Sequence, residues 1–268
     1  MTTPDWAPPG VDLDVPSPAR VYDYLLGGAH NFAADRAFAE RVAAVIPTIA
    51  GAAQTNRAFV QRAVTFMAGQ GIDQFLDLGS GIPTVGHVHE IARALSPGSR
   101  VLYVDHDPVA VAHSELILRD VPGTAVLRAD LRHPQNVLDS PELAGLLDLT
   151  RPVGILLASV LPFVPDHDRP HEAVARLRDA AAAGSFLAIT HVVPEGDADG
   201  THQAASLYRG ASDSMAVRDR EQVAAFFGDW TLAEPGLVRT PRWRPSHPDD
   251  VQEAAGAVAV AGVGRKAT

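Results

Sequence analysis

Residues 75–83 read FLDLGSGIP, a short apolar run that carries one acid and leads directly into a Gly-Ser-Gly turn. Two later stretches have a similar form, VLYVDHDP at 101–108 and VLRADL at 126–131. Apolar runs of this length are typical of buried strands in parallel sheets, and open α/β sheets bind ligands where such strands end. The three stretches therefore predict a ligand site at one edge of a sheet. Its acids would be Asp77, Asp105 and Asp130.

The turn after Asp77 differs from a dinucleotide-binding loop. Such loops read G-x-G-x-x-G, but Gly79–Thr84 reads GSGIPT and lacks the third glycine. The carboxylate of Asp77 would repel a pyrophosphate, whereas it would favour a cationic cofactor without phosphate. S-adenosylmethionine is such a molecule, with an ammonium, a carboxylate and a sulfonium. The glycines would let the backbone approach that ligand closely.

Asp105 and Asp107 have different expected roles. Asp105 lies 26 positions after Gly79, close to where an acid usually meets ribose hydroxyls. Asp107 precedes a proline and an apolar helical run, so we expect it to cap a helix, at a cost of about 1 kcal/mol if it is lost. Asp130 could accept from the exocyclic amine of an adenine, with the Leu131 amide facing the ring. The alternative for Asp130 is a simple turn acid.

At this point the chain resembles the class I S-adenosylmethionine-dependent methyltransferases, and within them a bacterial S-adenosyl methyltransferase branch with a distinctive N-terminal segment. The similarity extends from about residue 17 to 264. One departure lies at Leu161-Pro162, because the branch usually has histidine after that leucine. The matching strings are PARVYDYLLGG (18–28), NF (31–32), DR (35–36), NRAF (56–59), QFLDLGSGIPT (74–84), VDHDP (104–108), FVPD (163–166) and EPGLV (234–238).

The resemblance implies an α/β, Rossmann-like fold that binds S-adenosylmethionine and transfers its methyl group. It also implies a late antiparallel strand in the sheet. Methyl transfer depends mainly on positioning, so the sequence identifies no catalytic residue. The cofactor-binding residues that we expect are Asp77, Gly79, Ser80, Gly81, Asp105, His106, Asp130, Leu131 and Ser159.

Composition agrees with a soluble cytoplasmic enzyme, and we expect its substrate to be a small molecule. The chain has 268 residues, of which 46% are hydrophobic, and no apolar run approaches the ~18 residues of a membrane helix. It has no cysteine, and its N-terminus does not read as a signal peptide. A formal net charge of −10 disfavours a nucleic-acid substrate. We expect no membrane partner, and the oligomeric state stays open.

The chain divides into three expected parts. Residues 1–16 are rich in proline and acids and should be flexible, and residues 17–70 should form a helical lid. In the lid, Ser17 would cap a helix that Gly27-Gly28 ends. Residues 71–268 should form the cofactor-binding domain, with a mostly parallel seven-stranded sheet and helices on both faces. The expected strands are 75–78, 101–104, 125–129, 153–158, 186–193, 230–233 and 257–263.

Several further residues allow two interpretations. Tyr22 and Tyr24 could cover the cofactor, although aromatic residues at helical spacing more often pack in a core. His191, near the end of an expected strand, could serve the substrate or be an ordinary rim residue. Residues 166–171 (DHDRPH) look like metal ligands, but a helix start explains them better, so we expect no metal. A protein that binds S-adenosylmethionine without transferring its methyl group is the alternative function.

Overall fold

The structure is a computed structural model that describes residues 8, 11–82, 87–246 and 258–268. Parts of three expectations lie outside these residues: most of the flexible N-terminus, Pro83-Thr84 of the glycine turn, and the start of the expected strand at Ala257. Residues 11–16 are described, and Val11 and Leu13 there pack beside Phe32. The predicted flexibility of residues 1–16 stays a prediction.

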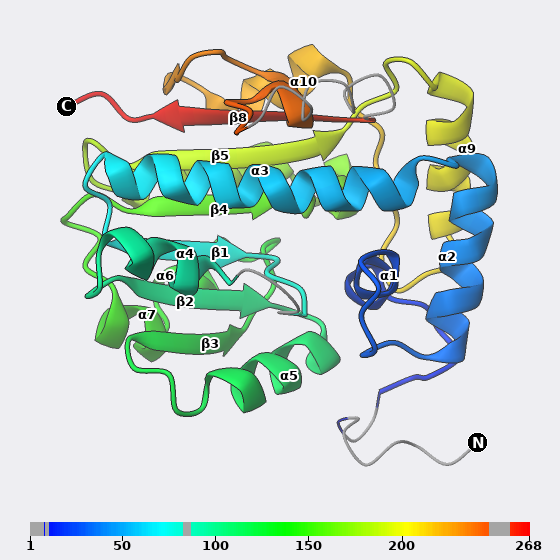
Figure 1. Ribbon diagram of the computed structural model, residues 1–268, viewed down its shortest axis with the longest axis horizontal. Coiled ribbons are helices and arrows are strands. Elements are labelled where there is room, and N and C mark those ends of the chain that lie inside the picture. The colour runs from blue at the N-terminus through cyan, green and yellow to red at the C-terminus, as the bar shows by residue number, and fades with distance from the viewer. Residues whose placement is uncertain (1–7, 9–10, 83–86, 247–257) are drawn as a thin grey trace.

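A mixed sheet in the order β3-β2-β1-β4-β5-β8-β6 forms the centre of the molecule (Figure 1). The first five strands of this order are parallel, and β8 runs antiparallel to β5. The predicted Rossmann-like fold and late antiparallel strand are confirmed. The strands are β1 Gln74–Leu78, β2 Arg100–Asp105, β3 Thr124–Arg128, β4 Gly154–Ala158, β5 Phe186–Val192, β6 Thr231–Leu232, β7 Val238–Arg239 and β8 Ala259–Arg265.

The expected number of seven strands is corrected to eight within the described residues, because β7 also pairs with β8. Its two residues, Val238 and Arg239, are too few to show the alternation that identifies a strand in a sequence. The additional strand lies on the antiparallel side of the sheet, next to β8, and leaves the carboxyl ends of the parallel strands unchanged.

Helices cover both faces of the sheet, as the βα alternation predicts. Helices α3, α4 and α5 pack on one face and α6, α7, α8 and α10 on the other. Helices α1, α2 and α9 stand beyond the tips of the parallel strands (Figure 1). The α-helices are α1 Pro18–Leu25, α2 Ala33–Val45, α3 Ile49–Gly69, α4 Val88–Leu95, α5 Pro108–Leu118, α6 Pro134–Leu138, α7 Pro141–Leu146, α8 Pro170–Ala180, α9 Ala198–Tyr208 and α10 Arg220–Ala224. Short 3-10 turns span Leu161–Phe163, Asp166–Asp168, Ala225–Phe227 and Thr240–Arg242.

None of the helices in the described ranges is both long and apolar enough to cross a membrane.

Buried charges hold α1 against two other helices. The Arg20 guanidinium donates from Nε to both oxygens of Asp35, and its Nη1 lies 3.5 Å from an Asp107 oxygen. All three side chains are almost fully buried, so each charge needs these partners. The Asp35 carboxylate also accepts from the backbone amides of Ser17 and Phe32. One cluster thus joins α1, α2 and α5.

Asp107 has a second role beyond the predicted cap. It caps α5 by accepting from the amides of Val109 and Ala110, as expected. Its other oxygen accepts from the Ser17 hydroxyl and faces Arg20. Ser17 occupies the predicted N-cap position of α1, but the expected cap hydrogen bond is not formed, because its hydroxyl is donated to Asp107.

We predict that Asp107→Ala lowers the free energy of unfolding by about 3 kcal/mol, because it removes a cap and leaves Arg20 short of a buried partner. Asp219→Ala is the matched control, since Asp219 caps α10 from an exposed position and should lose only about 1 kcal/mol. Urea denaturation measures both variants. Equal losses would show that the contacts of Asp107 with α1 add nothing to stability.

Candidate functional site

One cavity lies at the carboxyl edge of the sheet, between the strand ends and helices α1, α2 and α3. The expected residues around it come from three different strands and the turns that follow them. Seven of the nine expected cofactor residues line this cavity. They are Asp77, Gly79, Ser80, Gly81, Asp105, His106 and Ser159.

The glycine turn has the geometry that only glycine tolerates well. Gly79 and Gly81 have φ values of +66° and +63°. The amides of Gly79 and Ser80 both donate to the Val104 carbonyl, which holds the turn against β2. A Cβ on Gly79 would lie 2.3 Å from the Val160 side chain, whereas a Cβ on Gly81 would meet no atom of the described residues within 4 Å. Gly79 thus allows close packing of two loops.

Asp77 is a buried acid beside a cation. Burial is the largest effect on its pKa and raises it to about 7, while the Arg57 guanidinium lowers that pKa and Asp105 raises it. In the described part of the chain, no hydrogen bond to the Asp77 carboxylate is formed. Both Asp77 and Arg57 line the cavity, so they present an acceptor and a positive charge to the same space.

Asp105 is held in place by two backbone amides. Its carboxylate accepts from Gly81 at 2.7 Å and from Asp107 at 2.9 Å. Burial raises the pKa of Asp105, while these amides and His106 lower it. The glycine turn, the second acid and the α5 cap are therefore one connected unit.

His106 is a cation at ordinary pH. Its Nε2 lies 3.1 Å from a carboxylate oxygen of Asp213, and this hydrogen bond is the main cause that raises the pKa of His106 to about 9. Asp213 belongs to the segment after α9, so the pair connects the end of β2 to that segment.

A second, smaller cavity adjoins the first on the far side of Asp105 and His106. The remaining two expected residues, Asp130 and Leu131, line it. The Asp130 carboxylate is bound by the Arg132 guanidinium at 2.6 to 2.9 Å, and this ion pair outweighs burial and lowers the pKa of Asp130. Because its charge is already paired with Arg132, the Asp130 carboxylate could act toward a ligand only as a hydrogen-bond acceptor.

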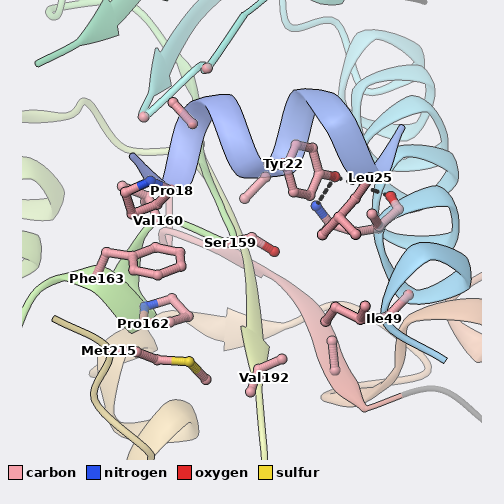
Figure 2. A pocket seen from close by; sticks show the side chains of 18 of the residues that line it. Pro18, Tyr22, Leu25, Ile49, Ser159, Val160, Pro162, Phe163, Val192 and Met215 are labelled. Atoms are coloured by element: carbon pink, nitrogen blue, oxygen red, sulfur yellow. Dashed lines mark hydrogen bonds between the residues drawn. The ribbon is translucent and has the colours of Figure 1, made fainter. Parts of the chain in front are cut away.

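Ser159 directly follows β4 and has a strained conformation, with φ of +59°. A hydrogen-bonded chain extends from it across the cavity wall. Ser159 Oγ lies 3.3 Å from Thr190 Oγ1, which lies 2.6 Å from Asn56 Oδ1, and Asn56 Nδ2 donates to the Tyr22 hydroxyl. Figure 2 shows Tyr22 and Ser159 on facing sides of the cavity. Of the two tyrosines left open, Tyr22 lines the cavity, whereas Tyr24 packs against an apolar cluster.

His191 does not face the substrate side, so the interpretation as a substrate residue is not supported by its position. It is fully buried, its Nδ1 donates to the Val192 carbonyl, and its Nε2 accepts from Arg218. Burial lowers the pKa of His191 to about 4, so it stays neutral.

Arg218 instead holds the loop that contains the Leu161-Pro162 departure. Its guanidinium donates to the carbonyls of Leu161 and Val164 and to the Asp166 carboxylate, and the side chain is 1% exposed. Pro162 lines the cavity, and its carbonyl accepts from the Ala216 amide. Pro162 therefore gives the cavity a rigid apolar wall at the position where the branch usually has histidine.

No group of three or more possible metal ligands occurs in the part of the chain that is described. In the stretch 166–171, Asp166 pairs with Arg218, and His171 stacks on Phe226.

Sequence reasoning missed three residues that shape the site, which are Asn56, Thr190 and Arg218. Asn56 is one of several polar positions in α3, so its polarity alone did not single it out. Thr190 and Arg218 gave no signal, because all of their partners described above are distant in the sequence, at separations from 27 positions (Arg218 to His191) to 134 positions (Thr190 to Asn56).

Comparisons with known proteins agree with this geometry. A family described as S-adenosyl methyltransferase matches residues 4–267. A candidate methyltransferase from Thermobifida fusca is 40% identical, with a TM-score of 0.92 over 98% of this chain and 100% of that one. A DUF574 family protein from Streptomyces avermitilis is 34% identical, with a TM-score of 0.90 over 95% of this chain and 100% of that one.

A more distant structure shows the fold alone. Human N-acetylserotonin methyltransferase in complex with SAM is 16% identical, with a TM-score of 0.51 over 87% of this chain and 57% of that one. The comparison with curated proteins finds no match.

We predict that Gly79→Ala costs about 3 kcal/mol of unfolding free energy or more, and Gly81→Ala about 1 kcal/mol. Both substitutions meet the left-handed backbone penalty, but only the first also clashes with Val160. Thermal and urea unfolding of the two variants compare them directly. A Gly81→Ala variant that is the less stable of the two would contradict the packing role of Gly79.

Proposed function

The chain belongs to the S-adenosyl methyltransferase family, and from that premise we propose that it methylates a small molecule held in the cavity beside α1. The protein is thus an S-adenosylmethionine-dependent methyltransferase, and the acceptor and the individual site residues are what we propose. The observation that carries the proposal is the continuity of the cavity, which runs from the glycine turn to an apolar wall without interruption. When bound, S-adenosylmethionine supplies a methyl group on an electrophilic sulfonium.

The residues of the cavity fit this cofactor. Its methionine part is zwitterionic, and the cavity presents to it the carboxylate of Asp77 and the guanidinium of Arg57. We propose that Asp77 accepts from the ammonium and that Arg57 pairs with the carboxylate. A pyrophosphate would gain from Arg57 but would be repelled by Asp77, so the pair selects a zwitterion.

The nucleoside part fits the other expected residues. We propose that Asp105 accepts from the ribose hydroxyls, and that Gly79, Ser80 and Gly81 form the floor beneath them. His106, Asp130 and Leu131 would surround the adenine in the smaller cavity. The backbone of Ser159 would complete the methionine end of the site.

The lid also supports a small acceptor. Pro18, Tyr22 and Leu25 of α1 face the cavity (Figure 2), and the buried cluster of Arg20, Asp35 and Asp107 fixes that helix over the strand ends. We propose that residues 17–70 exclude water from the reacting centre, which strengthens electrostatic interactions there. With the net charge of −10, this enclosure disfavours a nucleic acid as the acceptor.

We expect label from methyl-tritiated S-adenosylmethionine to enter the small-molecule fraction of a cell extract when the enzyme is added, and not its protein or nucleic-acid fractions. Asp105→Asn should weaken binding of S-adenosylhomocysteine about 30-fold in calorimetry, because a charge-assisted hydrogen bond is lost. Asp73→Asn is the matched control, since Asp73 pairs with Arg151 before the start of β1. Label found only in protein or nucleic acid would overturn the small-molecule acceptor.

We also expect cofactor affinity to fall with pH below 7. The pKa of Asp77 in the free protein is raised to about 7, so the carboxylate must lose a proton to bind an ammonium as pH decreases. Between pH 7 and 5.5 the affinity for S-adenosylhomocysteine should decrease on the order of tenfold. In Asp77→Asn the affinity should be weaker and nearly flat over this range. A wild-type profile as flat as that of the variant would show that Asp77 does not titrate on binding.

A further inference from the structure

The cavity has two chemically different halves. The cofactor half is defined by Asp77, Gly79 and Asp105, and the acceptor half lies beyond Ser159, between α1, α2, α3 and the end of β5. Figure 2 shows the side chains of the acceptor half converging on one space. Those that matter here are Leu25, Ile46, Ile49, Phe163, Val192 and Met215.

Charge is confined to the cofactor half among the described residues. The charged side chains that line the cavity are Arg57, Asp77, Asp105 and His106. An ionised group placed among the aliphatic side chains of the acceptor half would lose its hydration without gaining a partner. The lining therefore favours an acceptor molecule with an uncharged, mostly apolar body.

The polar chain beside this half has a fixed direction. The Ala53 carbonyl can only accept, so the Tyr22 hydroxyl donates to it at 3.1 Å. Tyr22 then accepts from Asn56 Nδ2, which turns Asn56 Oδ1 toward Thr190. The Thr190 proton is thereby donated to Asn56, at a distance of 2.6 Å.

This direction decides what Ser159 can do. Since Thr190 already donates elsewhere, the 3.3 Å contact between the two hydroxyls requires Ser159 to donate to Thr190. The Ser159 oxygen, which points into the cavity in Figure 2, is left with acceptor capacity only. A polar group that meets it must bring its own hydrogen.

We infer that the methyl acceptor is a neutral, mostly apolar molecule that donates one N–H or O–H to the Ser159 hydroxyl. This rests on the proposed function and specifies its substrate class. Ser159 is then a specificity-determining residue at the border of the two halves. The Tyr22, Asn56 and Thr190 side chains act through it, because they set the direction of its proton.

The test uses the full chain saturated with S-adenosylhomocysteine and four small probes. Indole carries an N–H donor, benzofuran has nearly the same shape without one, and benzoate and benzamidinium carry opposite charges. Ligand-observed NMR titration measures their affinities. Indole should bind at least tenfold more tightly than benzofuran, and both charged probes should bind more weakly than either. Equal binding of indole and benzofuran, or preferred binding of a charged probe, would overturn the inference.

Two variants distinguish an effect on probe binding from an effect on cofactor binding. Ser159→Ala should remove the preference for indole while S-adenosylhomocysteine affinity changes less than threefold. Thr190→Val should also reduce the preference, because Ser159 can then donate to a ligand. If Ser159→Ala instead weakens S-adenosylhomocysteine and keeps the preference, the hydroxyl serves the cofactor and the inference is wrong.

A steric pair checks the location. Leu25→Trp should abolish binding of both neutral probes, because Leu25 lines the cavity. Leu26→Trp is the matched control on the adjacent residue, which is not among the lining residues, and should leave probe binding unchanged. Probe binding that survives Leu25→Trp would place the probes elsewhere and contradict the inference. A wild-type protein that fails to bind S-adenosylhomocysteine would refute the cofactor site itself, which is a different failure.

Discussion

The buried carboxylate of Asp107 is the joint on which the arrangement of the site depends. One of its oxygens accepts from backbone amides at the start of α5. The other accepts from the Ser17 hydroxyl and faces the Arg20 guanidinium of the N-terminal helix. Its own amide donates to Asp105. A carboxylate in this position cannot leave its partners without an unpaired charge remaining inside the protein. Asp105 and helix α1, which line the same cavity, are consequently fixed relative to each other by one residue.

Charged and aliphatic side chains occupy different parts of the cavity. Parallel strands bring their ends to one edge, so the acids of β1 and β2 meet there, and α3 adds Arg57 beside them. Helices α1 and α2 contribute aliphatic surface instead. In the proposed function, the polar side chains bind the cofactor and the aliphatic side chains surround the acceptor, which suits a reaction that depends on positioning more than on proton transfer.

The parts that could be predicted from the sequence are those with a local pattern. The parallel strands, the positive-φ glycines and the cap at Asp107 each follow from a few adjacent residues. The contacts of Asp107 with Ser17 and Arg20 could not be predicted, because nothing in their sequence separation indicates contact. β7 was too short for a period to show, and the loop clamp of Arg218 depends on carbonyl groups, which every residue has. Local patterns thus predicted the strand ends and the glycine turn better than the contacts of the N-terminal helices.

The segment from Ser212 to Arg218 contacts the N-terminal segment, the end of β2, the cavity and the loop after β4. Ser212 donates its amide to Pro16, Asp213 holds His106, and Met215 lines the acceptor half. Arg218 then fixes the loop after β4. These seven consecutive positions therefore couple the surroundings of His106 to the wall that contains Met215. An insertion within this segment would be expected to displace both at once, so the two parts of the cavity cannot be altered independently there.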